Sequence, residues 1–188
     1  MLVLGLVLPP HRIMRLSAVT VILSGLVLWT PYQQSTNAAS VPPIHDITTD
    51  TEDPPRFVDV VPLREADNAR NPPDYAGARV AEAQKRGYPG LGPLQVQAMP
   101  DAVFPEALAA AKEMGWTIVA SVREEGRIEA TDRTFWFGFR DDVVIRLRAE
   151  DGGTRIDVRS KSRVGGSDIG ANARRITTYL DRLAARLS

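Results

Sequence analysis

The pattern of hydrophobic and polar positions changes its period near the C-terminal end of the chain. In residues 154–163, Ile156 and Val158 alternate with polar residues, which predicts a β-strand. Beyond the glycines at 165–166 the apolar residues recur every three or four positions, which predicts a closing helix that begins near residues 167–168. The apolar stripe of this helix consists of Ile169, Ala173, Ile176, Leu180, Leu183 and Leu187.

The same two periods organise the residues before this strand. Residues 94–98 alternate as a strand, and a helix is predicted to begin at Pro100, with Asp101 as its N-cap, and to end at Gly115. Four strands then follow in a meander, and their inward positions are Trp116, Ile118, Ala120, Val122, Ile128, Ala130, Val143, Ile145, Leu147, Ile156 and Val158. The order strand, helix, four strands, helix predicts an α+β fold. Its curved antiparallel sheet would carry two helices on one face, as in helix-grip or TBP-half folds.

Three regions are predicted along the chain. They are an N-terminal membrane anchor or signal segment (1–38), a linker with an extended acidic segment (39–93, called the arm below) and the α+β domain (94–188). In the arm, proline pairs at 54–55 and 72–73 exclude long helices. Residues 57–61 are apolar and largely β-branched, but Pro62 limits them to an edge strand at best. Residues 78–86 are compatible with a short helix.

Strand positions between the apolar ones must point to the other face of the sheet, and that face is basic. Its cations are Arg123, Arg127, Arg133, Arg146, Arg148, Arg155, Arg159 and Lys161, set against Glu129 and Asp157. Because the arm is acidic, either it folds over this face, which we favour, or the face is an open anion-binding groove. Exposed ion pairs contribute about 0–1 kcal/mol each, so apolar arm residues such as Phe57 must decide the docking. Solvent exposure of both Arg146 and Arg159 would contradict the covering interpretation.

Composition narrows the functional classes. The 188 residues include 23 basic and 23 acidic side chains, so no net charge favours nucleic acid, and the lack of cysteine excludes disulfides and thiolate chemistry. Residues 16–29 are almost wholly apolar and follow Arg12 and Arg15, as in an export signal or a signal anchor. Both interpretations place the domain in the bacterial cell envelope. Residues 16–30 would either contact the inner membrane or be cleaved from a periplasmic protein.

Cations and glycines near the start of the closing helix form one candidate site. Arg159, Lys161 and Arg163 precede the glycines at 165–166, and N–H groups at such a helix start can bind phosphate. The spacing matches no nucleotide-binding motif. A turn in which Asp168 is the N-cap is the simpler interpretation.

A polar ribbon runs beside the apolar stripe of the closing helix. Asp168, Asn172, Arg175 and Tyr179 are spaced by three or four residues, so they share one side of the helix. We expect a hydrogen-bond network that locks the helix to a strand. The functional alternative is a small polar pocket lined by this ribbon together with Arg159 and Ser162.

Aromatic and histidine residues supply two further candidates. Trp136 stands in the most aromatic stretch, residues 135–139, which forms either an exposed patch for a partner or lipid interface, or strand ends whose rings enter the core. His45 follows the predicted export segment and precedes Asp46, a pair that can serve acid–base chemistry or make a structural contact, the simpler interpretation. No metal-ligand spacing or cofactor motif occurs, so neither a metal nor a cofactor is expected.

Several of these segments together resemble a known family. Residues 44–50, 53–55, 115–116, 127–132, 136–142, 159–163 and 168–172 are similar to the bacterial and plastid family known as domain of unknown function 1499, and the resemblance covers residues 42–187. It implies an extracytoplasmic, often membrane-tethered domain with no established activity and no agreed catalytic residues. Many relatives carry paired cysteines where this chain has residues 44–50, and this departure weighs against a cysteine-dependent role here.

We therefore expect a membrane-anchored or exported envelope domain that binds a partner without catalysing a reaction. The partner would be an envelope protein or an anionic lipid or ligand, not nucleic acid, and the candidate contacts are Arg146, Arg159, Arg163, Asp168, Asn172, Arg175, Trp136 and His45. One alternative is an envelope hydrolase that uses His45 and the polar ribbon, which requires His45 or Asp168 at a shared concave pocket. The other is a lipid-binding grip with an apolar cavity between sheet and helices.

Overall fold

The computed structural model describes Pro9, Met14, residues 17–25, Val27, Trp29, residues 41–134 and residues 138–188. The chain divides into two units, Met1–Ser40 and Val41–Ser188. In the first unit residues 17–25 are helical. Among the described residues, no helix has both the length and the apolar character that a membrane span requires. The predicted boundary between the arm and the α+β domain, at residue 94, lies inside the second unit.

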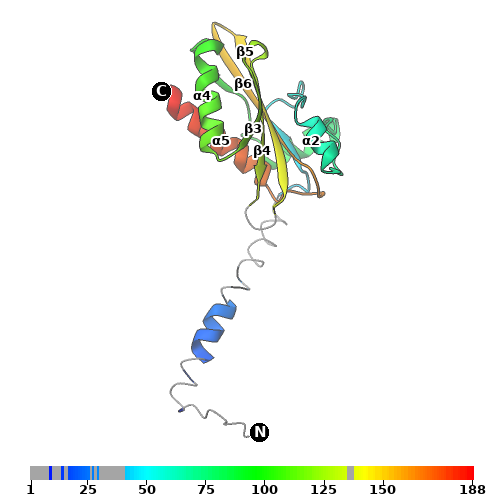
Figure 1. The fold of residues 1–188 in the computed structure, drawn as a ribbon, viewed down its shortest axis with the longest axis vertical. Coiled ribbons are helices and arrows are strands. Elements are labelled where there is room, and N and C mark those ends of the chain that lie inside the picture. The colour runs from blue at the N-terminus through cyan, green and yellow to red at the C-terminus, as the bar shows by residue number, and fades with distance from the viewer. Residues whose placement is uncertain are drawn as a thin grey trace. The chain divides into compact units, whose positions relative to one another are not determined.

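The second unit is an α+β fold in which an antiparallel sheet is the central layer (Figure 1). Its elements are β1 (Asp46–Thr48), α2 (Val61–Ala66), α3 (Ala78–Gly87), β2 (Leu94–Val96), α4 (Pro100–Glu113), β3 (Thr117–Val122), the 3₁₀-helix η1 (Arg123–Glu125), β4 (Arg127–Arg133), β5 (Arg140–Glu150), β6 (Gly153–Ser162) and α5 (Ala171–Leu187). The strand order is β1-β6-β5-β4-β3, and β2 also pairs with β6. Between β5 and β6, Asp151 and Gly152 have φ of 49° and 78°, the left-handed pair that a two-residue hairpin turn requires.

The main hydrophobic core lies between one face of the sheet and the helices α4 and α5 (Figure 1). The alternation predicted from the sequence is confirmed on β4, β5 and β6, because Ile128, Val143, Ile145, Ile156 and Val158 are all fully buried in this core. On β3 it is wrong beyond Ile118, because a register shift places Ala120 opposite Glu129 and Val122 opposite Arg127, on the other face of the sheet. The two helices are also joined directly. Tyr179 of α5 stacks on Trp116 with ring centroids 5.2 Å apart, and its hydroxyl donates to the Ala107 carbonyl oxygen of α4 at 3.1 Å.

The arm differs from its predicted structure in two places. The prediction of an edge strand at residues 57–61 is wrong, because helix α2 begins at Val61 and Pro62 stands in its first turn. A missing N–H is harmless there, since the first turn of a helix has no internal acceptor for it. The arm contributes strand β1 instead, which pairs with β6 so that Asp46 lies opposite Lys161.

Both helix starts in the α+β region also require correction. The N-cap of α4 is Met99, and Asp101 lies in the first helical turn, where its negative charge still suits the positive end of the helix dipole. Helix α5 begins at Ala171, after Gly170 in the left-handed conformation. Ile169 precedes the helix with φ of 52°, so it does not belong to the apolar stripe.

Candidate functional site

The sheet face opposite α4 and α5, called the charged face below, is covered by the arm. The side chain of Arg159 is 2% exposed and that of Arg146 is 18% exposed. Phe57 and Val60 of the arm pack on Val144 of β5, which forms a small second core on this face. These observations agree with the covering interpretation and contradict an open groove over the middle of the sheet.

The innermost charges on this face gather around Asp46 of β1. Its carboxylate accepts two hydrogen bonds from Arg159, each 2.8 Å long, and lies 3.0 Å from the Lys161 ammonium nitrogen. All three side chains are buried. The Arg159 guanidinium also lies over two aromatic rings, 4.8 Å from the Phe57 centroid and 5.5 Å from the Tyr75 centroid. The cation–π contacts and the bidentate pair hold this guanidinium in one orientation.

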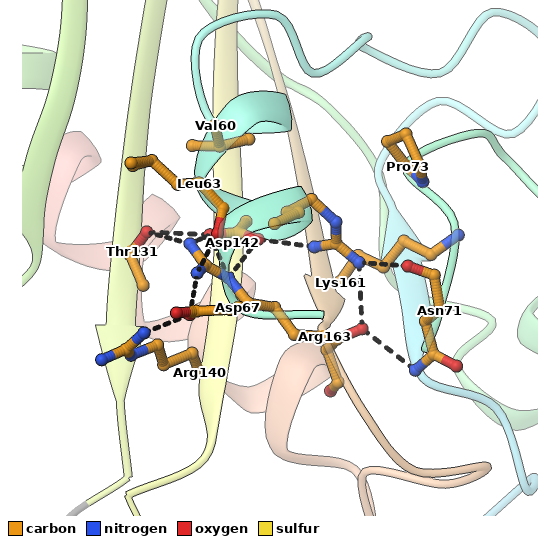
Figure 2. Close-up of polar contacts among 12 residues, drawn as sticks. Val60, Leu63, Asp67, Asn71, Pro73, Thr131, Arg140, Asp142, Lys161 and Arg163 are labelled. Carbon is orange, nitrogen blue, oxygen red and sulfur yellow. Dashed lines mark hydrogen bonds and ion pairs between the residues drawn. The ribbon is translucent and has the colours of Figure 1, made fainter. Parts of the chain in front are cut away.

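A second buried carboxylate, Asp142 of β5, joins the sheet to α2. It accepts hydrogen bonds from Arg64 at 2.5 Å, from two nitrogens of Arg163 at 2.9 and 2.7 Å and from the Thr131 hydroxyl at 2.8 Å. Figure 2 shows the neighbouring Asp67 carboxylate, which forms ion pairs with Arg163 and Arg140. Four hydrogen bonds leave the Asp142 carboxylate fully engaged.

Residues 71–75, called the strap below, cross over these two clusters. Three buried cations, one from α2 and two from β6, donate hydrogen bonds to backbone carbonyl oxygens of the strap. The bonds run from Arg64 to Asn71 (2.8 Å), from Arg159 to Pro73 (2.9 Å) and from Lys161 to Asp74 (2.6 Å). The side-chain amide of Asn71 also donates to the carbonyl oxygens of Ser162 and Gly165 (Figure 2 shows the first of these bonds). The strap is therefore attached to the domain mainly through its own backbone.

Two clefts flank the strap. The smaller, of about 280 Å³, lies between α2 and the start of the strap, and Arg64 lines it. The larger, of about 580 Å³, lies between residues 52–57 and the end of the strap, and Arg159, Phe57 and Tyr75 line it. Val61 and Pro73 line both clefts, so the two are neighbours.

A more exposed set of charges continues the face beyond the larger cleft. Arg146, Arg148 and Arg155 each form ion pairs with the arm residue Asp50 and with Asp157 of β6. Burial alone raises the pKa of the Asp50 carboxyl, but backbone N–H groups and the neighbouring guanidinium groups outweigh it, so the pKa is lowered. The basic residues of this part are thus neutralised within the chain.

Polar side chains of the ribbon on α5 form hydrogen bonds and ion pairs with the sheet, as expected for a network that locks the helix to a strand. Arg175 forms ion pairs with Asp132 at 2.8 Å and Asp141 at 2.6 Å. The Ser160 hydroxyl donates to the Asn172 side-chain oxygen at 2.7 Å, and the Asn172 amide donates to the His45 carbonyl oxygen at 3.0 Å. These bonds tie α5 to β4, β5, β6 and the arm.

His45 and Asp168 do not meet at either cleft. The Asp168 carboxylate accepts from the backbone N–H groups of Gly170 at 2.8 Å and Asn172 at 2.9 Å, and burial raises its pKa. Burial and the nearby Lys161 ammonium lower the pKa of His45, whose Nδ1 has no hydrogen-bond partner among the described residues. Neither residue lines the two clefts above. Trp136 lies outside the described residues.

The structure adds residues to the site that sequence reasoning did not select: Asp46, Arg64, Tyr75 and Asp142. Strand alternation had already placed Lys161 on the basic face. It could also have placed Asp142 there, because Asp142 lies two residues before Val144, and every second residue of a strand points to the same face. For Arg64 the only signal was Pro62, which is favoured in the first turn of a helix.

These features define an α+β domain with one apolar sheet face under two helices and one charged face sealed by the arm of the same chain. The chain belongs to the family described as Protein of unknown function (DUF1499), which matches residues 46–183 and confirms the resemblance seen in the sequence. No curated protein matches the sequence.

Solved structures that are similar to this chain include the following two. The crystal structure of TTHA0849 from Thermus thermophilus is 15% identical, with a TM-score of 0.30, and the match covers 52% of this chain and 97% of that chain. The crystal structure of Ara h 8.0201 is 12% identical, with a TM-score of 0.25, and the match covers 50% of this chain and 95% of that chain.

Proposed function

We propose that this protein is a non-catalytic binding module of the cell envelope, exported or held at the membrane by residues 16–30, whose ligand occupies the larger cleft. The observation that carries this proposal is the buried Arg159 guanidinium at the cleft, held against the rings of Phe57 and Tyr75. A fixed charge beside aromatic surface can orient a ligand that has a polar group and an apolar body. We also propose that the fold is of helix-grip type.

Side chains at the cleft that are not engaged within the chain support this location. Arg56 and Asp74 line the larger cleft, and both are exposed. Neither side chain forms an ion pair or a hydrogen bond with another described residue. The cations of the neighbouring sheet are, by contrast, paired with arm carboxylates. A ligand in the cleft therefore meets two charges, on Arg56 and Asp74, that no other described residue neutralises.

The competing functions gain less support from the described residues. A hydrolase based on His45 and the polar ribbon needs them at a shared pocket, and neither cleft includes them. A lipid-binding grip needs an apolar cavity between the sheet and α4 or α5, whereas both clefts lie on the arm side. An envelope protein or an anionic ligand is the partner that we propose, and not nucleic acid.

The binding function is testable with the purified full-length chain. After incubation with a small-molecule extract of bacterial envelopes, native mass spectrometry should detect a retained ligand on the wild type. The variant Val61→Trp, which narrows both clefts, should retain less than a fifth as much. Arg182→Ala changes an exposed α5 residue and should behave as wild type. Absence of any retained ligand on a folded wild type would contradict the proposal.

The location has its own test. A reporter enzyme that is active only outside the cytoplasm, fused after Ser188, should be active in a bacterial host. Deleting residues 16–30 should abolish that activity. An inactive reporter on the full-length chain, present at normal abundance, would contradict export.

A further inference from the structure

The buried charges beneath the strap do not balance. Arg64, Arg159, Lys161 and Arg163 have side chains at most 5% exposed, whereas the carboxylates buried to the same degree among them are Asp46 and Asp142. Asp67 adds a third negative charge, but it is 30% exposed and is shared with Arg140. Burying a cation without a counter-charge is unfavourable, so this region favours an additional negative charge.

The strap binds these cations through neutral backbone carbonyl oxygens, and the carboxylate of its Asp74 is exposed and forms no ion pair with any of them. Its carbonyl oxygens accept from Arg64, Arg159 and Lys161 at 2.6–2.9 Å. A neutral carbonyl satisfies an N–H donor, yet a hydrogen bond from a cation to an oxyanion is roughly twice as strong as one between neutral groups. Oxyanion oxygens in place of the strap carbonyls would therefore bind the same donors more tightly.

Two buried donors beside the strap have no acceptor among the described residues. Arg64 Nε belongs to a side chain that is 2% exposed and lines the smaller cleft. Tyr75 Oη belongs to the strap itself and lines the larger cleft. Burial raises the pKa of Tyr75 to about 12, so the hydroxyl keeps its proton and can donate. An N–H donor can be satisfied only by an acceptor, which favours an anionic ligand over a cationic one.

We infer that the ligand of this site carries an oxyanion, a carboxylate or a phosphate, and that the strap occupies part of its binding position when the site is empty. This inference rests on the proposed binding function and specifies the ligand class. The oxyanion would accept hydrogen bonds from Arg159 and Tyr75 and would displace strap carbonyls from the buried cations. Its source is either a free anion or the headgroup of an anionic lipid.

Acidic residues at the larger cleft restrict the charge of the ligand. Glu52 pairs with Lys85 at 2.7 Å, and Asp53 pairs with Arg146 at 3.0 Å, so these carboxylates are neutralised. The Asp74 carboxylate has no such partner among the described residues, so it repels an anion in the cleft. Replacing Asp74 by asparagine removes that repulsion and keeps the backbone carbonyl that binds Lys161. The variant Asp74→Asn should consequently bind anions more tightly than the wild type.

Titration calorimetry on the full-length chain provides the test. Inorganic phosphate and acetate are the free probes, and vesicles of phosphatidylglycerol, with phosphatidylcholine vesicles as the neutral control, are the lipid probe. Asp74→Asn should increase the affinity for the bound anion about threefold to tenfold, and Arg56→Ala should decrease it by a similar factor. The matched changes Asp181→Asn and Arg182→Ala, on exposed α5 positions, should change it less than twofold. The probe that binds identifies the source.

Hydrogen exchange tests the displacement of the strap. The Asn71 N–H donates to the Arg163 carbonyl oxygen at 3.0 Å, so its exchange should become faster when the bound anion displaces the strap. Equal or slower exchange at saturation would overturn the displacement. Anion binding that is insensitive to both Asp74→Asn and Arg56→Ala would overturn the site. Retention of a neutral or cationic envelope molecule, without binding of any anionic probe, would overturn this inference and leave the proposed binding function intact.

Discussion

The two faces of the sheet are both buried, but different forces bury them. On the helix side, side chains such as Val143, Ile145 and Ile176 are fully buried among other apolar groups. On the charged face the apolar contact is confined to a small core around Phe57, Val60 and Val144, and the rest of the cover is ion pairs and hydrogen bonds. Apolar burial has no preferred direction, whereas each buried ion pair requires one partner in one geometry.

This difference predicts unequal tolerance to substitution. An apolar core accepts another apolar residue of similar volume at a small cost in stability. A buried carboxylate that serves two guanidinium groups has no such substitute, because its removal leaves both cations without a counter-charge. The charged face should therefore be the more sensitive of the two, although it contains the smaller hydrophobic core.

The largest effect is expected for Asp142→Asn. Asparagine keeps the shape of the side chain but removes the charge that Arg64 and Arg163 share. Loss of one partner of a buried pair typically costs about 3–5 kcal/mol, and we expect the free energy of unfolding to fall by that amount. Urea unfolding followed by circular dichroism measures it, with the exposed Asp181→Asn as control. A loss below about 1 kcal/mol would show that the two faces are equally tolerant.

A smaller effect is expected for Ile176→Val in the helix-side core. Ile176 is fully buried on α5, and removal of one methylene group from such a site typically costs about 0.5–1.5 kcal/mol. The same urea experiment applies. If this conservative change destabilised the protein as much as Asp142→Asn, the contrast between the faces would be lost.

Acidification should weaken the charged face selectively. Hydrogen bonding to Arg140 lowers the pKa of Asp67, and the pKa of Asp50 is also lowered. A carboxyl group whose folded-state pKa is depressed stabilises the fold above its ordinary pKa and loses that contribution as the pH falls through the folded value. The urea midpoint should consequently fall between pH 5 and pH 3, and it should fall less in Asp50→Asn, which lacks one of these carboxylates.

Comparison of the two chains at the same pH values separates this effect from other titrating groups. The lowered pKa of His45 also weakens the fold on acidification, but between about pH 7 and pH 5. Asp168, with a raised pKa, contributes in the opposite direction. Both groups are present in the wild type and in Asp50→Asn, so their contributions cancel in the difference. An identical loss in the two chains would contradict a role for Asp50.

The smallest effect is expected for Arg186→Ala. This exposed α5 residue forms ion pairs with Glu106 and Glu113 of α4. Water and salt screen such pairs, and the side chains lose conformational entropy to form them. The urea midpoint should shift less than in Asp142→Asn or Ile176→Val. A shift as large as that of Ile176→Val would mean that exposed pairs on the helix side contribute like the buried ones.

Elements that are formed by interactions between neighbouring residues were predicted from the sequence, and elements that depend on distant residues were not. The helices α4 and α5 and the strands β2 to β6 were predicted because their periods are local, although both helix starts needed correction. Residues 78–86, within α3, were recognised only as compatible with a short helix. Strand β1 was not predicted, because it is defined by its hydrogen bonds with β6, which lies far along the chain. Residues 57–61 have strand-like composition, but packing on Val144 and the first turn of α2 override it.

The sequence predicted that a basic sheet face lies under an acidic arm, but it did not predict which side chains form ion pairs with each other. The basic face and its acidic cover followed from alternation and from the charge of the arm, and Arg146 and Arg159 were placed correctly on that face. Arg163 was selected only for the candidate site before the glycines, and the structure adds it to the charged cluster around Asp142. Their roles as ligand contacts stay predictions, as do those of His45, Asp168, Asn172 and Arg175. For the strap the sequence predicted only that the proline pair at 72–73 excludes a long helix, because the attachment of the strap depends on backbone carbonyls, which are present in every residue type.

By itself the sequence determined which residues of β4, β5 and β6 face the helices, which face is charged and to which family the chain belongs, because periodicity and motif spacing can be read from neighbouring residues. The register shift in β3 came only from its pairing with β4. Only the tertiary structure decided which carboxylate neutralises which cation. Asp46 and Arg159 are 113 residues apart, and several other carboxylates of the arm had the same charge. The path of the arm over the sheet, set by a few apolar contacts and by the backbone of the strap, selects one pairing and leaves the two clefts beside it.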